Sequence, residues 1–173
     1  MVNNIILIGF MGTGKTSVGR RLAEEFRYSF VDTDEEVERV TGLTVAQIFK
    51  KYGEKRFRSE ETIVLKKLLL KDKQVIATGG GLVLREENQE LLRQGGLIIC
   101  LTADKETIYE RVSKRSTRPL LMNGDMRERV DTLLAERQDA YQIADHFVDT
   151  TGKSPKAIAN EIYEIIRKRP CVE

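Results

Sequence analysis

The chain is poor in the residues that build metal clusters and disulfide frameworks. Its 173 residues include no tryptophan, one histidine, three prolines and two cysteines. Cys100 and Cys171 lie far apart, and neither has a Cys-x-x-Cys partner or another neighbour that would share a metal. A structural zinc site needs several ligands at close spacing, and disulfides belong to oxidising compartments. We therefore expect two free thiols in a reducing cytoplasm.

Neither sign of charge dominates, and no apolar run is long. Lys and Arg total 29 against 27 Asp and Glu, a formal net charge of +2, and the two signs are interleaved. The basic excess that binds nucleic acid or a membrane surface is missing. No apolar run approaches the roughly 20 residues of a membrane span, and the run within residues 1–10 has no basic region before it. We expect a cytoplasmic monomer with neither a nucleic-acid nor a membrane partner.

Apolar, β-rich runs alternate with amphipathic stretches along the chain. The predicted strands are Asn4–Ile8, Ser29–Asp32, 74–78, 97–101 and His146–Asp149. Helical spacing marks 16–26, 54–70, 105–114, 127–141 and 155–168. This alternation predicts a single domain of the α/β class, with a parallel sheet covered by helices on both faces. Ligands of such sheets bind at the carboxyl ends of the strands, so the loops there carry the functional prediction.

Residues 9–16 read Gly-Phe-Met-Gly-Thr-Gly-Lys-Thr and match the pattern G-x-x-x-x-G-K-[ST] in full. A predicted strand precedes the motif and a predicted helix follows it. The glycines allow backbone N–H groups to turn toward phosphate oxygens, and the helix N-terminus adds partial positive charge. Lys15 should reach the β- and γ-phosphates, and the Thr16 hydroxyl should ligate Mg²⁺. The motif predicts nucleotide binding but no particular reaction, because motors, switches and kinases share it.

The second predicted strand ends in an Asp-Thr-Asp sequence at residues 32–34. Alternate residues of an extended segment point the same way, so both carboxylates could face the phosphate-binding loop. One could hold Mg²⁺, and the other could accept a proton from an attacking hydroxyl. The alternative is that Asp34 caps the next helix. The spacing does not decide between the two.

Three glycines, residues 79–81, follow the third predicted strand. They leave room for a small ligand against the backbone, with a plain flexible turn as the alternative. Arg58 lies on a predicted helix three residues before Glu61 and could form a surface pair with it. Arg58 and Arg137 are ambiguous one at a time. Two guanidinium groups together could bind a carboxylate bidentately, but spacing cannot show that they converge.

Residues 113–125 interrupt the alternation of strand and helix. The segment is charged and contains Arg115, Arg118, Pro119 and Gly124. A long irregular loop in a compact domain is usually either a functional lid or disordered. Because its arginines would have phosphate charge to neutralise nearby, we interpret the segment as a lid.

Together, these motifs resemble the shikimate kinase family over essentially the whole chain. Besides the phosphate-binding loop, the resemblance rests on Asp-Thr-Asp at 32–34, Phe-Arg-x-x-Glu at 57–61, Gly-Gly-Gly at 79–81, Arg-Pro-Leu-Leu at 118–121 and Arg-x-x-x-Tyr at 137–141. The resemblance implies the three-layer α/β/α P-loop kinase fold of nucleoside monophosphate kinases, with five parallel strands in the order 2-3-1-4-5. It also implies a substrate-binding subdomain at 34–61 and a lid at 113–125.

The same resemblance implies transfer of the γ-phosphoryl group of ATP to the 3-hydroxyl of shikimate, with Mg²⁺ as cofactor. This is a step toward chorismate and the aromatic amino acids. Asp34 would bind the ring hydroxyls and act as the base or orient the attacking oxygen. Lys15 and Arg118 would stabilise charge on the transferring group, Arg118 in the manner of an arginine finger.

The binding residues are carried over position by position from the family. Shikimate would be bound by Asp34, Arg58, Gly80, Gly81 and Arg137. Mg²⁺ would be held by Thr16 and Asp32. ATP would be bound by Gly12, Thr13, Gly14, Lys15, Thr16, Ser17, Arg111, Arg118 and Pro155, with Arg111 and Pro155 near the base.

Other kinases of the same fold, such as gluconate or nucleotide kinases, are the nearest alternatives. A planar nucleobase acceptor favours aromatic or amide side chains, whereas Asp34, Arg58 and Gly80 suit a hydroxylated carboxylic acid. A GTP-dependent switch should carry an Asn-Lys-x-Asp motif, which this sequence lacks. A kinase-like fold that has lost activity and serves as a binding module is disfavoured, because Lys15, Asp34 and Arg118 are all present.

Overall fold

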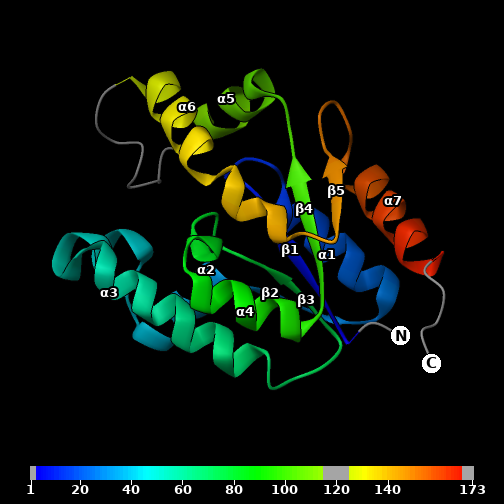
Figure 1. The fold of residues 1–173 in the computed structure, drawn as a ribbon, viewed down its shortest axis with the longest axis horizontal. Coiled ribbons are helices and arrows are strands. Elements are labelled where there is room, and N and C mark those ends of the chain that lie inside the picture. The colour runs from blue at the N-terminus through cyan, green and yellow to red at the C-terminus, as the bar shows by residue number, and fades with distance from the viewer. Residues whose placement is uncertain (1–2, 115–124, 169–173) are drawn as a thin grey trace.

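A five-stranded parallel sheet organises the computed structural model, which describes residues 3–114 and 125–168 (Figure 1). The strands are β1 (Asn4–Ile8), β2 (Ser29–Asp32), β3 (Gln74–Ala77), β4 (Leu97–Thr102) and β5 (His146–Asp149). They lie in the order β2-β3-β1-β4-β5, and every neighbouring pair is parallel. The α/β class and the strand order expected from the sequence are confirmed.

Strand β1 lies at the centre of the sheet, and all of its residues are buried. A central parallel strand is covered on both faces, which explains its uninterrupted apolar sequence. Ile5 packs with α1 (Lys15–Phe26) and α7 (Pro155–Arg167) on one face. Ile6 belongs to the core on the other face. In Figure 1, α1 and α7 lie together on the side of the sheet away from α3 and α4.

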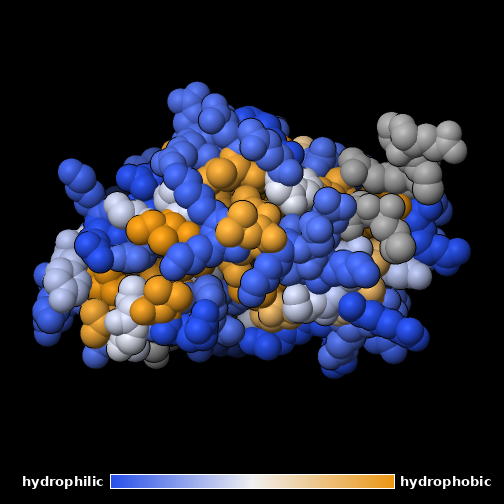
Figure 2. Space-filling view, turned by 90° about the horizontal axis from the view of Figure 1, so that it is seen from below, coloured by the Kyte–Doolittle hydropathy of each residue, from blue (hydrophilic) through white to orange (hydrophobic). Residues whose placement is uncertain are grey.

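The second face is covered by four helices. These are α3 (Val45–Leu68), α4 (Glu86–Gly95), α5 (Lys105–Ser113) and α6 (Met126–Arg137). Each of them contributes at least one buried apolar residue to the same core cluster. Figure 2, which views the molecule from below, shows hydrophilic residues over much of the visible surface with apolar residues among them. None of the helices in the described ranges is both long and apolar enough to cross a membrane.

The region after β2 is more helical than the sequence predicted. Helix α2 (Thr33–Thr41) begins directly at the end of the strand, because Asp32 caps its first turn. Helix α3 begins at Val45, where a capping box forms, rather than at residue 54. Gly53 interrupts α3 with a φ of 79°, a left-handed conformation that glycine adopts without strain. The sequence prediction captured only the part of α3 after this kink.

The predicted helix at 127–141 is divided in two. Helix α6 ends at Arg137, and a short 3-10 helix, η3 (Asp139–Ile143), follows it. The segment 113–125, predicted as a lid, lies outside the described residues except for its ends, and Arg118 is among those outside. The division of the chain into a substrate-binding subdomain and a lid therefore stays a prediction.

Candidate active site

The phosphate-binding loop connects β1 to α1, as the motif predicted. All three of its glycines have a positive φ, which disfavours other residues, with Gly12 at 84°. Gly14 is the N-cap of α1 with a φ of 94°. Gly9 has a φ of 135°, and a Cβ atom there would overlap the carbonyl oxygen of Leu101 on β4. The loop can therefore follow this path only with glycine at these positions.

The Lys15 side chain folds back over the loop that contains it. Its Nζ donates hydrogen bonds to the carbonyl oxygens of Gly9, at 2.7 Å, and Phe10, at 2.9 Å. The residue is 9% exposed and lines a hollow with the neighbouring loop residues. A buried ammonium above backbone N–H groups is suited to bind phosphate oxygens. The full lining of the hollow is Gly12, Gly14, Lys15, Thr16, Ser17, Asp32, Asp34, Thr78, Gly79 and Gly80.

Thr16 and Asp32 lie side by side, as a shared metal site would require. The Thr16 hydroxyl donates to Oδ2 of Asp32 at 2.8 Å. A hydroxyl and a carboxylate are hard oxygen ligands, which fit Mg²⁺. The described residues contain no cluster of three or more His, Cys, Asp or Glu side chains that could hold a metal. Mg²⁺ in kinases usually needs only one or two protein ligands besides phosphate, so this pair fits that ion.

The structure decides which aspartate caps α2. Oδ1 of Asp32 accepts the backbone N–H of Asp34 at 3.0 Å, so Asp32 is the N-cap. The alternative in which Asp34 caps the helix is wrong. Asp34 lies in the first turn of α2 rather than on an extended segment, yet both carboxylates line the same hollow as Lys15. The helical turn, and not strand alternation, brings them to one side.

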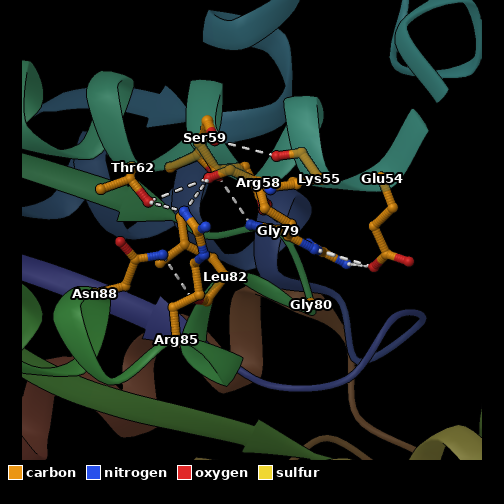
Figure 3. Close-up of polar contacts among 12 residues, drawn as sticks. Glu54, Lys55, Arg58, Ser59, Thr62, Gly79, Gly80, Leu82, Arg85 and Asn88 are labelled. Atoms are coloured by element: carbon orange, nitrogen blue, oxygen red, sulfur yellow. Dashed lines mark hydrogen bonds and ion pairs between the residues drawn. The ribbon is translucent and has the colours of Figure 1, made fainter. Parts of the chain in front are cut away.

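Arg58 reaches from α3 to the glycine loop, which we define as residues 79–81. Its side chain is 11% exposed and forms ion pairs with Glu61, at 2.7 Å, and Glu54, at 2.9 Å. A Cβ atom on Gly81 would lie 2.6 Å from its Nη2, so the guanidinium packs directly on this glycine. Figure 3 shows the side chain extending beside Gly79 and Gly80 toward Glu54. The pair of Arg58 and Glu61 exists, but it is buried rather than on the surface.

Arg137, at the end of α6, approaches the glycine loop from another direction. It is 3% exposed, and its Nε has no hydrogen-bond partner. Its Nη1 would lie 3.6 Å from a Cβ atom on Gly80, and its guanidinium lies 5.8 Å from the centre of the Phe10 ring. A buried guanidinium donor without an acceptor is costly. Arg137 is therefore positioned to receive an anion at the glycine loop.

Glu61 belongs to this cluster, although the sequence predicted no role for it beyond the Arg58 pair. Its side chain is fully buried, and its Oε1 has no hydrogen-bond partner. A Cβ atom on Gly79 would lie 2.8 Å from this oxygen and 2.5 Å from Oδ1 of Asp34. Burial, with a smaller contribution from the charge of Asp34, raises the pKa of Glu61 to about 7 against the attraction of Arg58. The i, i+3 spacing indicated the ion pair, but nothing local indicated its burial.

The pKa of Glu61 makes the stability of the protein depend on pH. The folded protein keeps this proton above pH 4.5, where an unfolded chain releases it, so the free energy of unfolding should fall between about pH 4.5 and 7. The effect is about 3 kcal/mol when complete. Glu61→Gln should remove this contribution. Urea unfolding at intervals from pH 5 to pH 8 checks this, and an unchanged pH slope in the variant would contradict it.

Of the positions expected near the nucleotide base, Arg111 lies on α5, the helix after β4, and Pro155 on α7, the helix after β5. Arg111 donates to the carbonyl oxygen of Gly12 at 3.1 Å and to both the hydroxyl and the carbonyl of Thr150 at 3.0 Å. Pro155 is the first residue of α7, where a missing N–H is harmless. Arg111 thus ties the phosphate-binding loop to the segment before Pro155.

A larger cavity is lined in part by Phe10 and Thr13 of the phosphate-binding loop, but its chemistry does not suit a phosphoryl transfer site. It measures about 340 Å³, against about 60 Å³ for the hollow at the phosphate-binding loop. Its lining is mainly apolar and comes largely from β4, α5, α6 and η3. Its Lys105 and Asp131 pair with each other at 2.7 Å. Size alone would favour this cavity, whereas the converging charges and backbone amides favour the smaller hollow.

Several known proteins that are similar to this chain are named shikimate kinases. The family model described as shikimate kinase matches residues 11–167. Shikimate kinases of Pelotomaculum thermopropionicum (51% identical; 99% of this chain and 100% of the relative covered) and Thermodesulfovibrio yellowstonii (47% identical; 93% of each covered) are similar over nearly their full lengths.

Solved structures agree with the sequence comparisons. The shikimate kinase of Acinetobacter baumannii in complex with shikimate aligns with a TM-score of 0.93 at 38% identity, covering 96% of this chain and 94% of that one. The Aquifex aeolicus shikimate kinase aligns with a TM-score of 0.80 at 36% identity, covering 95% and 96%. With this fold, a phosphate-binding loop beside a buried cluster of acids and arginines, and relatives of this similarity, the chain belongs to the shikimate kinase family.

Proposed function

We propose that the chain transfers the γ-phosphoryl group of ATP to the 3-hydroxyl of shikimate, giving shikimate 3-phosphate and ADP. The observation that carries the proposal is one hollow that joins the phosphate-binding loop to Asp34 and the glycine loop. Arg58 and Arg137 approach the same loop. The structure of the A. baumannii relative contains shikimate, which supports this acceptor. The reaction is a step toward chorismate and the aromatic amino acids.

The two arginines are proposed to bind the carboxylate of shikimate. Nε of Arg137 is buried without an acceptor, so an incoming carboxylate would satisfy it and recover part of its desolvation cost. Arg58 is already paired with two glutamates, which hold its guanidinium against Gly81. A guanidinium fork matches a carboxylate bidentately, and this gives the substrate a fixed orientation. The backbone N–H of Gly80 would donate to the same substrate.

Asp34 is proposed to face the attacking hydroxyl and to accept its hydrogen bond or its proton. It lines the same hollow as Lys15, which would bind the β- and γ-phosphate oxygens of ATP and stabilise the charge that develops on transfer. Thr16 and Asp32 would hold Mg²⁺, which neutralises phosphate charge when it is bound. Catalysis then consists mainly of positioning and charge stabilisation.

The remaining parts of the site are proposed from the family. The backbone amides of the phosphate-binding loop, together with Ser17, would surround the phosphates, and Arg111 and Pro155 would contact the base. Residues 34–61 would form the substrate-binding region and residues 113–125 the lid. We propose a monomer that acts in the cytoplasm.

Arg118 should act on turnover more than on binding. A lid arginine meets the transferring group only when the site is closed, so Arg118→Ala should lower kcat by at least about 100-fold while the KM for shikimate changes little. Steady-state kinetics with both substrates varied measures the two effects separately. Equal losses in kcat and in shikimate affinity would contradict the lid assignment.

A coupled ADP-release assay tests the proposed function. Mg²⁺-ATP is supplied with shikimate, gluconate or nucleoside monophosphates in parallel reactions. ADP release that depends on shikimate and needs added Mg²⁺ is the expected result. Release with gluconate or a nucleotide alone would overturn the substrate assignment, because the fold is shared with those kinases.

A further inference from the structure

The glycine loop needs contacts with other residues to keep one conformation. Glycine is required for close approach, since a Cβ atom on Gly79 or Gly81 would collide with the acids or with Arg58. Glycine also has the greatest backbone freedom of any residue, so three in a row do not hold a fixed conformation unaided. The Gly80 amide can serve a substrate only if other residues fix it.

Two side chains, one from before the loop in the sequence and one from after it, form hydrogen bonds with its backbone. Thr33, fully buried, accepts a hydrogen bond at its Oγ1 from the backbone N–H of Gly79 at 2.8 Å. Tyr141, also buried, donates its hydroxyl proton to the carbonyl oxygen of Gly80 at 2.7 Å. Burial raises the pKa of Tyr141 well above its usual range, so the hydroxyl remains a donor at neutral pH.

Internal hydrogen bonds complete the arrangement. The carbonyl of Gly79 accepts the N–H of Leu82 at 3.1 Å, and the carbonyl of Gly81 accepts the N–H of Leu84 at 3.2 Å. The N–H of a trans peptide points opposite to its C=O, so fixing the Gly79 carbonyl fixes the direction of the Gly80 N–H. In the same way, Tyr141 fixes the direction of the Gly81 N–H. Within the described residues, the Gly80 and Gly81 amides donate no hydrogen bond of their own.

The end of the loop is also tied to α3. Arg85, which follows the 3-10 helix η1 (Leu82–Leu84), donates to the carbonyl oxygen of Arg58 and to the hydroxyl of Thr62, each at 3.2 Å (Figure 3). The helix that carries Arg58 and the loop on which its guanidinium lies are therefore joined by a second contact. The loop cannot shift without disturbing Arg58.

The two hydroxyls lie next to the residues proposed to bind the substrate. Thr33 directly precedes Asp34, and Tyr141 lies four residues after Arg137. Each hydrogen bond thus sets the position of the glycine loop relative to one of these side chains. We propose that Thr33 and Tyr141 are positioning residues that hold the glycine loop, and with it the Gly80 and Gly81 amides, in register with Asp34 and Arg137 for shikimate binding. The proposal rests on the proposed function.

Steady-state kinetics of three variants tests this inference. Thr33→Val keeps the shape of the side chain without its hydroxyl, and Tyr141→Phe removes only the hydroxyl. Each should raise the KM for shikimate by about tenfold while the KM for ATP stays within about twofold. Thr33→Ser, which keeps the acceptor oxygen, should restore the wild-type KM for shikimate. Spectra of ¹⁵N-glycine-labelled protein should show a shifted Gly79 amide signal in Thr33→Val and a shifted Gly81 amide signal in Tyr141→Phe.

Each other outcome has a defined meaning. A shikimate KM that is unchanged in both the Val and the Phe variants, or an ATP KM that rises in parallel, would overturn the positioning role. So would a Thr33→Ser enzyme as impaired as Thr33→Val. Thermal unfolding of each variant identifies one that no longer folds, and the variants at the other position then decide the question. A wild type without shikimate-dependent ADP release would instead overturn the proposed function.

Discussion

Asp34→Asn should lower kcat by about 10² to 10⁴-fold and produce the largest loss of any single substitution in the site. Asparagine has nearly the shape of aspartate and can accept a hydrogen bond, but it cannot take up a proton and carries no charge. Asp34 shares a hollow with Lys15 and the glycine loop, so the substitution acts where the hydroxyl and the phosphates meet.

Comparison with Asp34→Ala separates the two roles proposed for this carboxylate. If Asp34 takes the proton, the Asn and Ala variants should be equally slow. If it only orients the hydroxyl, Asn should retain more activity than Ala. ADP release at saturating shikimate and ATP measures both, with Asp72→Asn on the exposed surface as the control. Activity of Asp34→Asn within about tenfold of the wild type would rule out the proton-accepting role, and the same result for Asp34→Ala would rule out both roles.

Lys15→Met should lower kcat by about 10² to 10³-fold and weaken ATP binding. The ammonium is the charge placed closest to the phosphate-binding amides, and it is 9% exposed, so water cannot replace it easily. Methionine has a similar length and keeps the apolar contacts of the side chain. Lys15→Arg should not restore activity, because the larger guanidinium fork does not fit a site shaped for a compact ammonium.

The effect of Lys15→Met should be electrostatic rather than structural. In the wild type, Nζ is bonded to the Gly9 and Phe10 carbonyls, so the variant also loses two loop contacts. Thermal unfolding of this variant, compared with the control Lys67→Met on the exposed side of α3, measures how much stability the two lost loop contacts contribute. A Lys15→Met enzyme with near-normal kcat would show that the loop amides alone stabilise the transferring group.

The sequence was most reliable where the signal is local. The glycine spacing of residues 9–16, with a predicted strand before it and a predicted helix after it, predicted the loop between β1 and α1. The alternation of strands and helices predicted the parallel sheet. It was less reliable at helix boundaries. Asp34 was expected to continue the extended segment of Asp32, but it lies in the first turn of α2, which Asp32 caps. A cap and a metal ligand use the same carboxylate oxygens, so one residue type predicts either role.

By itself, the sequence determined the five strands, most of the helices and the phosphate-binding loop, because these depend on residues that are neighbours in the chain. Only the tertiary structure decided that Glu61 is buried, that Arg58 and Arg137 reach one glycine loop, and that Thr33 and Tyr141 hold that loop. These contacts join α2 and α3 to α6 and η3, which lie far away in the sequence. Their distances are set by how the helices pack on the sheet, and no local spacing encodes that packing.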